Sequence, residues 1–113
     1  MLDNDARGRV WLAEQEGRLI GCTAIALRDG DAAQLRWVLV DTAARGMGLG
    51  RRLVEAALDF SREAGRSSVF LESTDGLPES QALYDDLGFE TVSSNVEELW
   101  DGKRPLIKMR MQL

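Results

Sequence analysis

The first part of the chain alternates apolar and polar residues in short runs, a pattern typical of β-strands with one covered face. Residues 10–14 and 18–27 form two such runs, and Glu16-Gly17 between them suits a two-residue hairpin turn. A third run covers residues 34–41 and precedes a stretch rich in glycine. Regular alternation predicts that one face of this third strand carries three large apolar side chains: Leu35, Trp37 and Leu39.

The pattern then changes from a strand period to a helix period. Apolar residues recur at intervals of three and four across residues 48–64, and Gly65 follows as a helix cap. Residues 69–73 are typical of a buried strand, and Pro78 suits the first turn of a short helix that ends at Gly88. Two more strands complete the tail, and the last one alternates apolar and polar residues to the end of the chain.

Length and composition favour one folded domain spanning residues 1–113. A chain of 113 residues buries roughly 60 to 70% of its unfolded surface, which is enough for an independent core. Hydrophobic residues make up 44% and charged residues 29%, in the ordinary range of globular domains. The first residues lack the basic start and apolar centre of a signal peptide, and no apolar run approaches the roughly 20 residues that cross a bilayer. A cytoplasmic protein with no membrane partner is the expectation.

The reactive and charged residue types narrow the chemistry. No histidine is present, so Ser-His-Asp, Cys-His and His-ligated metal sites are excluded. A single cysteine, Cys22, can form neither a disulfide within the chain nor a cysteine cage, and metal-independent chemistry is therefore expected. With 14 basic against 19 acidic residues, the chain lacks the basic balance of nucleic-acid binders, so no nucleic-acid partner is expected.

Three glycines, Gly46, Gly48 and Gly50, lie between the third strand and the helical segment. Glycine lets the backbone aim several N–H groups at one ligand, and the following helix directs the positive end of its dipole to the same point. The segment therefore predicts a phosphate site, with an ordinary turn flanked by solvated arginines as the alternative. A P-loop is excluded because Arg51-Arg52 occupies the Lys-Ser/Thr position, and no third glycine completes a dinucleotide-binding G-x-G-x-x-G.

Another phosphate turn does fit the spacing. Arg45, Gly48 and Gly50 match Arg/Gln-x-x-Gly-x-Gly, and residues 83–89, Leu-Tyr-Asp-Asp-Leu-Gly-Phe, match L-Y-x-x-x-G-F. With both motifs in this order, the chain from about Val10 onward resembles the GNAT superfamily of N-acetyltransferases. The resemblance implies an α/β (α+β) fold in which a mixed, mostly antiparallel central sheet carries flanking helices. The family's opening strand and helix pair are missing, as in short forms that resemble the acetyltransferase half fused behind MarR-type regulators.

The resemblance also implies acetyl-CoA as the acyl donor. The family splays the third strand from its neighbour so that main-chain groups pair with pantetheine, and one N–H polarises the thioester carbonyl. The glycine turn would hold the pyrophosphate, with charge-assisted contacts from flanking arginines. The cofactor-binding residues expected on this basis are Val38, Leu39, Val40, Arg45, Gly46, Met47, Gly48, Leu49, Gly50 and Arg51.

Two further residues are candidates for proton transfer. Tyr84 matches the family tyrosine that protonates the departing CoA thiolate, and the alternative is a helix tyrosine with its hydroxyl at the surface. Glu72 is the best available general base, against the alternatives of a solvated strand glutamate and of deprotonation through water. Leu77 stands where the family often has asparagine, so a side-chain amide contact to the cofactor is not expected.

The function implied by the resemblance is acetyl-CoA-dependent N-acetyl transfer to a small-molecule or peptide amine. A non-catalytic acyl-CoA-binding domain excised from a larger regulator is the alternative, and a different phosphate ligand in the same turn is a third reading. The missing elements help build one wall of the acceptor groove in the family. A partner subunit or another part of a longer protein would complete that groove, so a homodimer and a fused domain both remain open.

Overall fold

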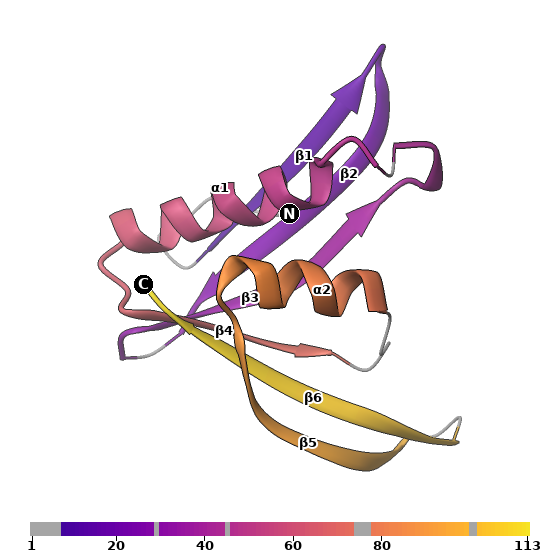
Figure 1. Cartoon of the computed structure of the whole chain (residues 1–113). Helices are drawn as coiled ribbons and strands as arrows, with labels where there is room; N and C mark the ends of the chain where they lie inside the picture. Colours follow the sequence, from indigo (N-terminus) through magenta and orange to yellow (C-terminus); the bar gives the residue numbers. More distant parts are fainter. Residues whose placement is uncertain (1–7, 29, 45, 74–77, 100–101) are drawn as a thin grey trace.

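The computed structural model describes residues 8–28, 30–44, 46–73, 78–99 and 102–113, which form one six-stranded sheet and two α-helices (Figure 1). The order of strands and helices is the predicted one. The strands lie in the order β1-β2-β3-β4-β6-β5, and each neighbouring pair is antiparallel except β3 with β4. None of the helices in the described part is long and apolar enough to cross a membrane. The elements are β1 (Gly8–Gln15), β2 (Arg18–Leu27), β3 (Ala32–Val40), a 3-10 turn (Thr42–Ala44), α1 (Leu49–Glu63), β4 (Ser68–Ser73), α2 (Pro78–Leu87), β5 (Glu90–Leu99) and β6 (Gly102–Gln112).

The turn between β1 and β2 has the geometry predicted for Glu16-Gly17. Both residues have positive φ values, 54° and 77°, as the central residues of a type I′ turn require. The backbone of this turn matches the right-handed twist of the two strands that it joins. The hairpin register therefore starts with Gln15 opposite Arg18.

Helix α1 ends at a glycine, as its sequence predicts. The Gly65 N–H donates to the Arg62 carbonyl, and the Arg66 N–H donates to the Ser61 carbonyl, both at 3.0 Å. With Gly65 at a φ of 79°, these are the two hydrogen bonds of a Schellman motif, which satisfies carbonyls at a helix end. The buried Ser61 hydroxyl donates to the Ala57 carbonyl at 2.9 Å, so its burial leaves no unpaired donor.

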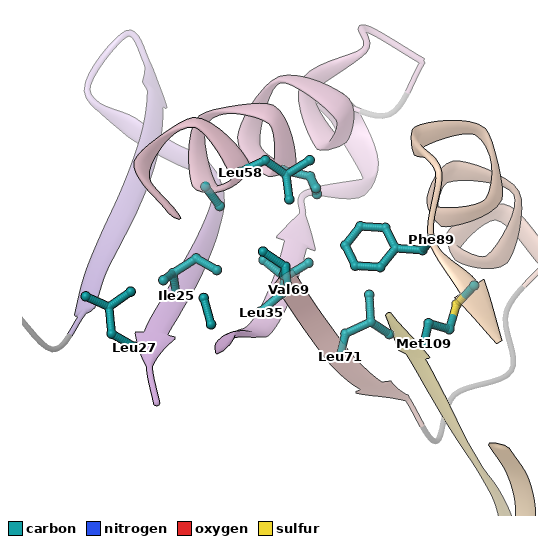
Figure 2. Packing of buried hydrophobic residues seen from close by; sticks show 11 residues of the cluster. Ile25, Leu27, Leu35, Leu58, Val69, Leu71, Phe89 and Met109 are labelled. Atoms are coloured by element: carbon teal, nitrogen blue, oxygen red, sulfur yellow. The ribbon is translucent and has the colours of Figure 1, made fainter. Parts of the chain in front are cut away.

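Both helices cover the same face of the sheet, and the core lies between them and the strands (Figure 1). Leu58 of α1 packs there with Val69 and Leu71 of β4 and with Met109 of β6. Phe89, where α2 meets β5, points into the same cluster beside Leu71 and Met109 (Figure 2). The other face of the sheet carries no helix among the described residues, and we call it the helix-free face.

A β-bulge in β3 changes which face its side chains occupy. The register against β2 shifts between Leu35 and Trp37, so Arg36 is an extra residue in this strand. Leu35 is buried in the core, whereas Trp37 is exposed and Val38 takes the next position against the core. The prediction that Leu35, Trp37 and Leu39 share one face is therefore wrong, because the bulge shifts the alternation by one residue.

Candidate active site

Strands β3 and β4 pair with each other at one end only. Their parallel register runs from Ala32 opposite Ser68 to Gln34 opposite Phe70. Beyond this point β3 keeps its partner β2, and Figure 1 shows β3 and β4 diverging. We call residues 35–40 the open edge of β3. The separation of these strands, which the family resemblance implied, is confirmed.

A loop contact anchors the paired end. The main-chain carbonyl of Asp31 accepts a hydrogen bond from the Ser67 N–H at 2.8 Å, and its carboxylate accepts one from the Ser67 hydroxyl at 2.7 Å. The hydroxyl contact lowers the pKa of the Asp31 carboxyl because it stabilises the charged form. The two strands are thus held together before Gln34 and separate after it.

The open edge presents main-chain hydrogen-bonding groups at every second residue. The Asp41 N–H donates to the Ile20 carbonyl at 2.8 Å, which makes these residues a hydrogen-bonded pair of the β2–β3 ladder. Hydrogen-bonded and non-hydrogen-bonded pairs alternate along an antiparallel ladder. Val38 and Val40 are therefore in non-hydrogen-bonded pairs with β2, and their main-chain N–H and C=O groups point away from β2. These groups face the side from which β4 has diverged. An extended ligand could form hydrogen bonds with them in the way that an added strand pairs with a sheet edge.

Leu39 lies between the two valines and is oriented differently. Its main-chain groups face β2, opposite Cys22, and its side chain is exposed on the helix-free face. Of the three strand residues predicted to contact the cofactor, Val38 and Val40 turn their main-chain groups to the open edge and Leu39 does not. This difference follows from the two-residue period of a strand.

The glycine turn, residues 46–50, leads from the end of β3 into α1. Gly46 and Gly48 have φ values of 87° and 75°, and a Cβ atom on either would meet nothing within 4 Å. Gly48 is the N-cap of α1, so no capping side chain occupies the first N–H groups of the helix. The first turn carries Arg51 and Arg52 and no acidic residue, the reverse of what the helix dipole favours. A bound anion would accept hydrogen bonds from the uncapped N–H groups and would balance the positive charge of the two arginines.

Asp41 fixes the direction of the chain as it leaves β3. Its carboxylate accepts a hydrogen bond from the Ala43 N–H at 3.1 Å and pairs with Arg18 at 2.8 Å, and its carbonyl accepts the Ala44 N–H at 2.9 Å. A cavity of about 220 Å³ lies beside this 3-10 turn, against the tip of the β1–β2 hairpin. Asp41 thus positions the start of the glycine turn, a role typical of aspartate at a turn that the motif spacing did not indicate.

Gly50 lies where β3, α1 and α2 meet. A Cβ atom placed on it would lie 3.8 Å from Val40 Cγ2 and 3.5 Å from Leu83 Cδ2. The end of the open edge, the glycine turn and α2 are therefore neighbours in space. Met47, within the turn, is exposed.

Arg51 forms an ion pair with Asp86 of α2 across the same junction. Both side chains are substantially exposed, so water screens the pair and its contribution to stability is only about 0 to 1 kcal/mol. The pair keeps the Arg51 guanidinium between α1 and α2. Of the other predicted positions, Arg45 and Leu77 lie outside the described residues.

Tyr84 lies on α2 with its ring packed against the core. The ring contacts Phe89 edge to face, with ring centroids 5.7 Å apart and planes at 67°. The Tyr84 carbonyl also accepts the Phe89 N–H at 2.9 Å, just beyond the end of the helix. These contacts hold Tyr84 on the helix-covered face, one residue after the Leu83 that borders Gly50.

Glu72 lies on the opposite face of the sheet from Tyr84. Its neighbour Leu71 is buried beneath the helices, so strand alternation places Glu72 on the helix-free face, where it is exposed. In the register with β6 it stands opposite Lys108. The structure therefore does not bring the two predicted proton-transfer residues together, because they lie on opposite faces of the sheet.

Gly21 of β2 supports the site from beneath α1. A Cβ atom on Gly21 would lie 3.0 Å from Leu49 Cδ2, 3.1 Å from the Leu39 carbonyl oxygen and 3.2 Å from Leu53 Cδ1. The missing side chain lets the N-terminal end of α1 approach the sheet, and Leu49 packs against β2. Sequence reasoning missed this role, although a glycine inside a strand pattern is the signal of such an approach.

Residues 1–89 match the acetyltransferase (GNAT) family, and the chain belongs to this family. An uncharacterised N-acetyltransferase of Escherichia coli, YjgM, is 38% identical over 85 residues, and the match covers 73% of this chain and 51% of YjgM. The chain thus spans about half the length of this relative.

Solved structures share the fold. An IAA acetyltransferase from Bacillus cereus has a TM-score of 0.84 at 21% identity, with 95% of this chain and 79% of that chain covered. An acetyltransferase from Salmonella typhimurium, yncA, solved with acetyl-CoA, has a TM-score of 0.82 at 24% identity, with 96% and 66% covered. The expected mixed, mostly antiparallel sheet with flanking helices is confirmed.

Proposed function

We propose that this chain binds acetyl-CoA as an acyl donor and transfers the acetyl group to the nitrogen of a small-molecule or peptide amine. The proposal rests on two features: the outward N–H and C=O groups along the open edge of β3, and the glycine turn at the N-terminal end of α1, which follows β3 after the 3-10 turn. The edge suits an extended arm with amide groups, and the turn suits a pyrophosphate. CoA carries both, and the Salmonella typhimurium structure of the same fold holds acetyl-CoA.

The donor would lie along the open edge and end on the glycine turn. Val38 and Val40 would pair with the amides of pantetheine as though the donor were another strand. The pyrophosphate would accept hydrogen bonds from N–H groups of the turn and of the first turn of α1, with a charge-assisted contact from Arg51. The empty space around Gly46 and Gly48 leaves room for this close approach.

Acetyl transfer at this edge is direct. The amine nitrogen attacks the thioester carbon, a C–N bond forms, and the C–S bond breaks to release the thiolate. A main-chain N–H of the open edge stabilises the oxyanion that forms on the carbonyl oxygen. Tyr84 gives its hydroxyl proton to the thiolate; phenols and thiols have ordinary pKa values of about 10 and about 8.5, so this transfer requires the hydroxyl to be held close to the sulfur.

The two residues proposed for proton transfer lie on opposite faces of the sheet, which suggests that the leaving thiolate and the acceptor amine lie on opposite sides of the open edge. Tyr84 lies on the helix-covered face, and Glu72 lies on the helix-free face. We place the acceptor on the helix-free face, where Glu72 takes a proton from the acceptor's ammonium group, directly or through water, and so frees the neutral amine that attacks. Nucleophile and leaving group are then on opposite sides of the thioester.

A thermal shift assay with three phosphate ligands tests the donor. A ligand present at 100 times its dissociation constant stabilises a fold by about 2.7 kcal/mol, so the melting temperature will rise with acetyl-CoA and stay unchanged with ATP or NAD at the same concentration. Equal shifts with all three ligands, or a shift with ATP alone, would assign the glycine turn to a different phosphate ligand.

The ion pair between Arg51 and Asp86 competes with the pyrophosphate for the same guanidinium. Asp86→Asn will therefore raise the affinity for acetyl-CoA, and Arg51→Gln will lower it, each by roughly twofold to fivefold, the size expected for an exposed charge contact. Isothermal titration calorimetry measures both effects, and added salt will reduce them.

The matched control for this pair lies at the other end of the same helix. Asp59 pairs with Arg62 at 3.0 Å, and both side chains are exposed. Asp59→Asn removes a surface ion pair of the same kind and will leave the affinity for acetyl-CoA unchanged. If Asp86→Asn also has no effect, Arg51 does not contact the donor.

A non-catalytic acyl-CoA-binding domain is the second candidate. It is favoured by the exposed position of Glu72 on the face opposite Tyr84. Such a domain would use the same open edge and glycine turn but would release no CoA. Loss of turnover in a Tyr84 variant separates the two functions, because a binding domain has no turnover to lose.

A further inference from the structure

Two opposite charges stand side by side on the helix-free face, where β6 runs beside β4 (Figure 1). Glu72 of β4 is opposite Lys108 of β6 in the antiparallel register. Their neighbours Leu71 and Met109 are buried beneath the helices, so strand alternation places both charged residues on the other face. The Cβ atoms of such cross-strand neighbours are about 4.5 to 5.5 Å apart, which is close enough for an ion pair to form.

The two charges nevertheless remain apart. The Lys108 ammonium nitrogen lies 5.0 Å from the centre of the Phe70 ring, so the side chain turns diagonally along the sheet instead of toward Glu72. No ion pair includes Glu72 or Lys108 among the residues that the structure describes. An exposed carboxylate and a half-buried ammonium are therefore both available to a ligand.

The position of these two groups relative to the opening between β3 and β4 gives the site a direction. Phe70 is the last residue of β4 that pairs with β3, opposite Gln34. Glu72 follows on the part of β4 that has separated from β3, whereas the Lys108 ammonium lies back over Phe70. A ligand held by both groups would therefore have its cationic end toward the opening and its anionic end toward the paired part of the strands.

We propose that the acceptor is an amine that also carries a carboxylate, with a free amino acid as the simplest case. Its ammonium group binds to the Glu72 carboxylate, and its carboxylate accepts a hydrogen bond from the Lys108 ammonium. The inference rests on the proposed function, which places the acceptor on this face with Glu72 as the general base. Lys108 determines specificity, because a diamine would bring a second cation against its ammonium.

The neighbouring strand β5 distinguishes Lys108 from the next cation on the same face, Arg110. Arg110 is opposite Glu90 of β5, an acidic residue. Lys108 is opposite the uncharged Ser93. Once the ammonium of the ligand occupies Glu72, Lys108 is left without an acidic cross-strand neighbour, whereas Arg110 keeps one. The carboxylate of the ligand therefore binds at Lys108.

Kinetics with matched acceptors test the proposal. Leucine is compared with isopentylamine, and phenylalanine with phenethylamine, because each amine lacks only the carboxylate. The unmodified chain will favour the amino acid in kcat/KM by roughly tenfold, and Lys108→Met will remove this preference while changing the value for the amine by less than about twofold. Lys108→Glu will shift the preference toward the diamine putrescine, a gain that a damaged fold would not produce. Equal losses with amino acid and amine in Lys108→Met would overturn the proposal.

The matched control lies on the helix-covered face. The Arg9 guanidinium lies 4.6 Å from the centre of the Phe60 ring, a contact of the same kind between a cation and an aromatic ring. Arg9→Met removes this contact and will leave the preference for amino acids unchanged. The same loss of preference in Arg9→Met would attribute the effect to the sheet as a whole and overturn the role of Lys108.

Binding measurements separate a failure of this inference from a failure of the proposed function. Calorimetry in the presence of CoA measures how the same amino acids and amines bind without any turnover. Tighter binding of the amino acid, lost in Lys108→Met, would support the site even if no acetyl transfer occurs. Equal binding of amino acid and amine, or no binding of either, would overturn the inference even if other amines are acetylated.

Discussion

Replacing Tyr84 with phenylalanine will lower the rate of acetyl transfer by roughly 100-fold to 10,000-fold, the usual contribution of a general acid. The ring remains, so its edge-to-face contact with Phe89 and its place in the core are kept. The substitution removes the hydroxyl that we propose gives its proton to the leaving thiolate. Affinity for acetyl-CoA will therefore stay unchanged while the rate falls.

The measurement is CoA thiol release under saturating acetyl-CoA, together with a calorimetric dissociation constant. Asp85→Asn is the control, because Asp85 is the exposed neighbour of Tyr84 on α2 and has no part in the proposed chemistry. An unchanged rate in Tyr84→Phe would remove this residue from the mechanism. An equal loss in Asp85→Asn would attribute the effect to the helix instead of the hydroxyl.

Replacing Gly48 with alanine will weaken acetyl-CoA binding at least tenfold, a change of about 1.4 kcal/mol or more. The Gly48 φ of 75° suits glycine, and an alanine there adopts it at a cost of about 1 to 2 kcal/mol. Relief of that strain rotates the peptide groups that we propose point at the pyrophosphate. The fold itself will survive, because the added Cβ meets no atom within 4 Å.

Gly17→Ala provides a closely matched control for this substitution. Gly17 has a φ of 77°, and a Cβ atom there also meets nothing within 4 Å, but it lies in the β1–β2 turn. Both variants will lose similar stability in urea unfolding, and only Gly48→Ala will lose affinity for acetyl-CoA. Equal affinities in the two variants would contradict a phosphate role for the glycine turn.

Local signals were sufficient to predict the elements of this fold. The hairpin turn at Glu16-Gly17 and the helix end at Gly65 both depend on residues next to each other in sequence, and the structure confirms both. Helical spacing predicted α1 to within one residue of each end. The antiparallel sheet and the separation of β3 from β4 followed from the family resemblance, because strand pairing is set by contacts far apart in the chain.

The bulge at Arg36 shows where the hydrophobic pattern fails. Leu35, Trp37 and Leu39 have the spacing of one strand face, and no residue type in this segment marks an extra residue. The shift is visible only in the pairing with β2, where the buried Thr23 hydroxyl donates to the Trp37 carbonyl. One inserted residue moves every later side chain of the strand to the opposite face of the sheet. For this reason the Leu39 side chain is exposed.

Most residues of the site were predicted from motifs, and Glu72 was predicted as the best available general base, but the way these residues lie relative to one another required the structure. Arg51 was predicted to contact the donor, yet its pairing with Asp86 spans 35 residues and depends on how α2 packs on α1. Glu72 and Tyr84 were predicted together, and only the alternation around Leu71 shows that they stand on opposite faces. Asp41 and Gly21 act through turn geometry and close packing, which motif spacing does not reveal.

The release of CoA from acetyl-CoA in the presence of a diverse panel of amines tests the central claim most directly. Acetyl transfer at the open edge of β3 predicts thiol release above the amine-free background with at least one amine, and its loss in Tyr84→Phe. Tight binding of acetyl-CoA with no release above background for any amine would contradict catalysis and leave an acyl-CoA-binding domain.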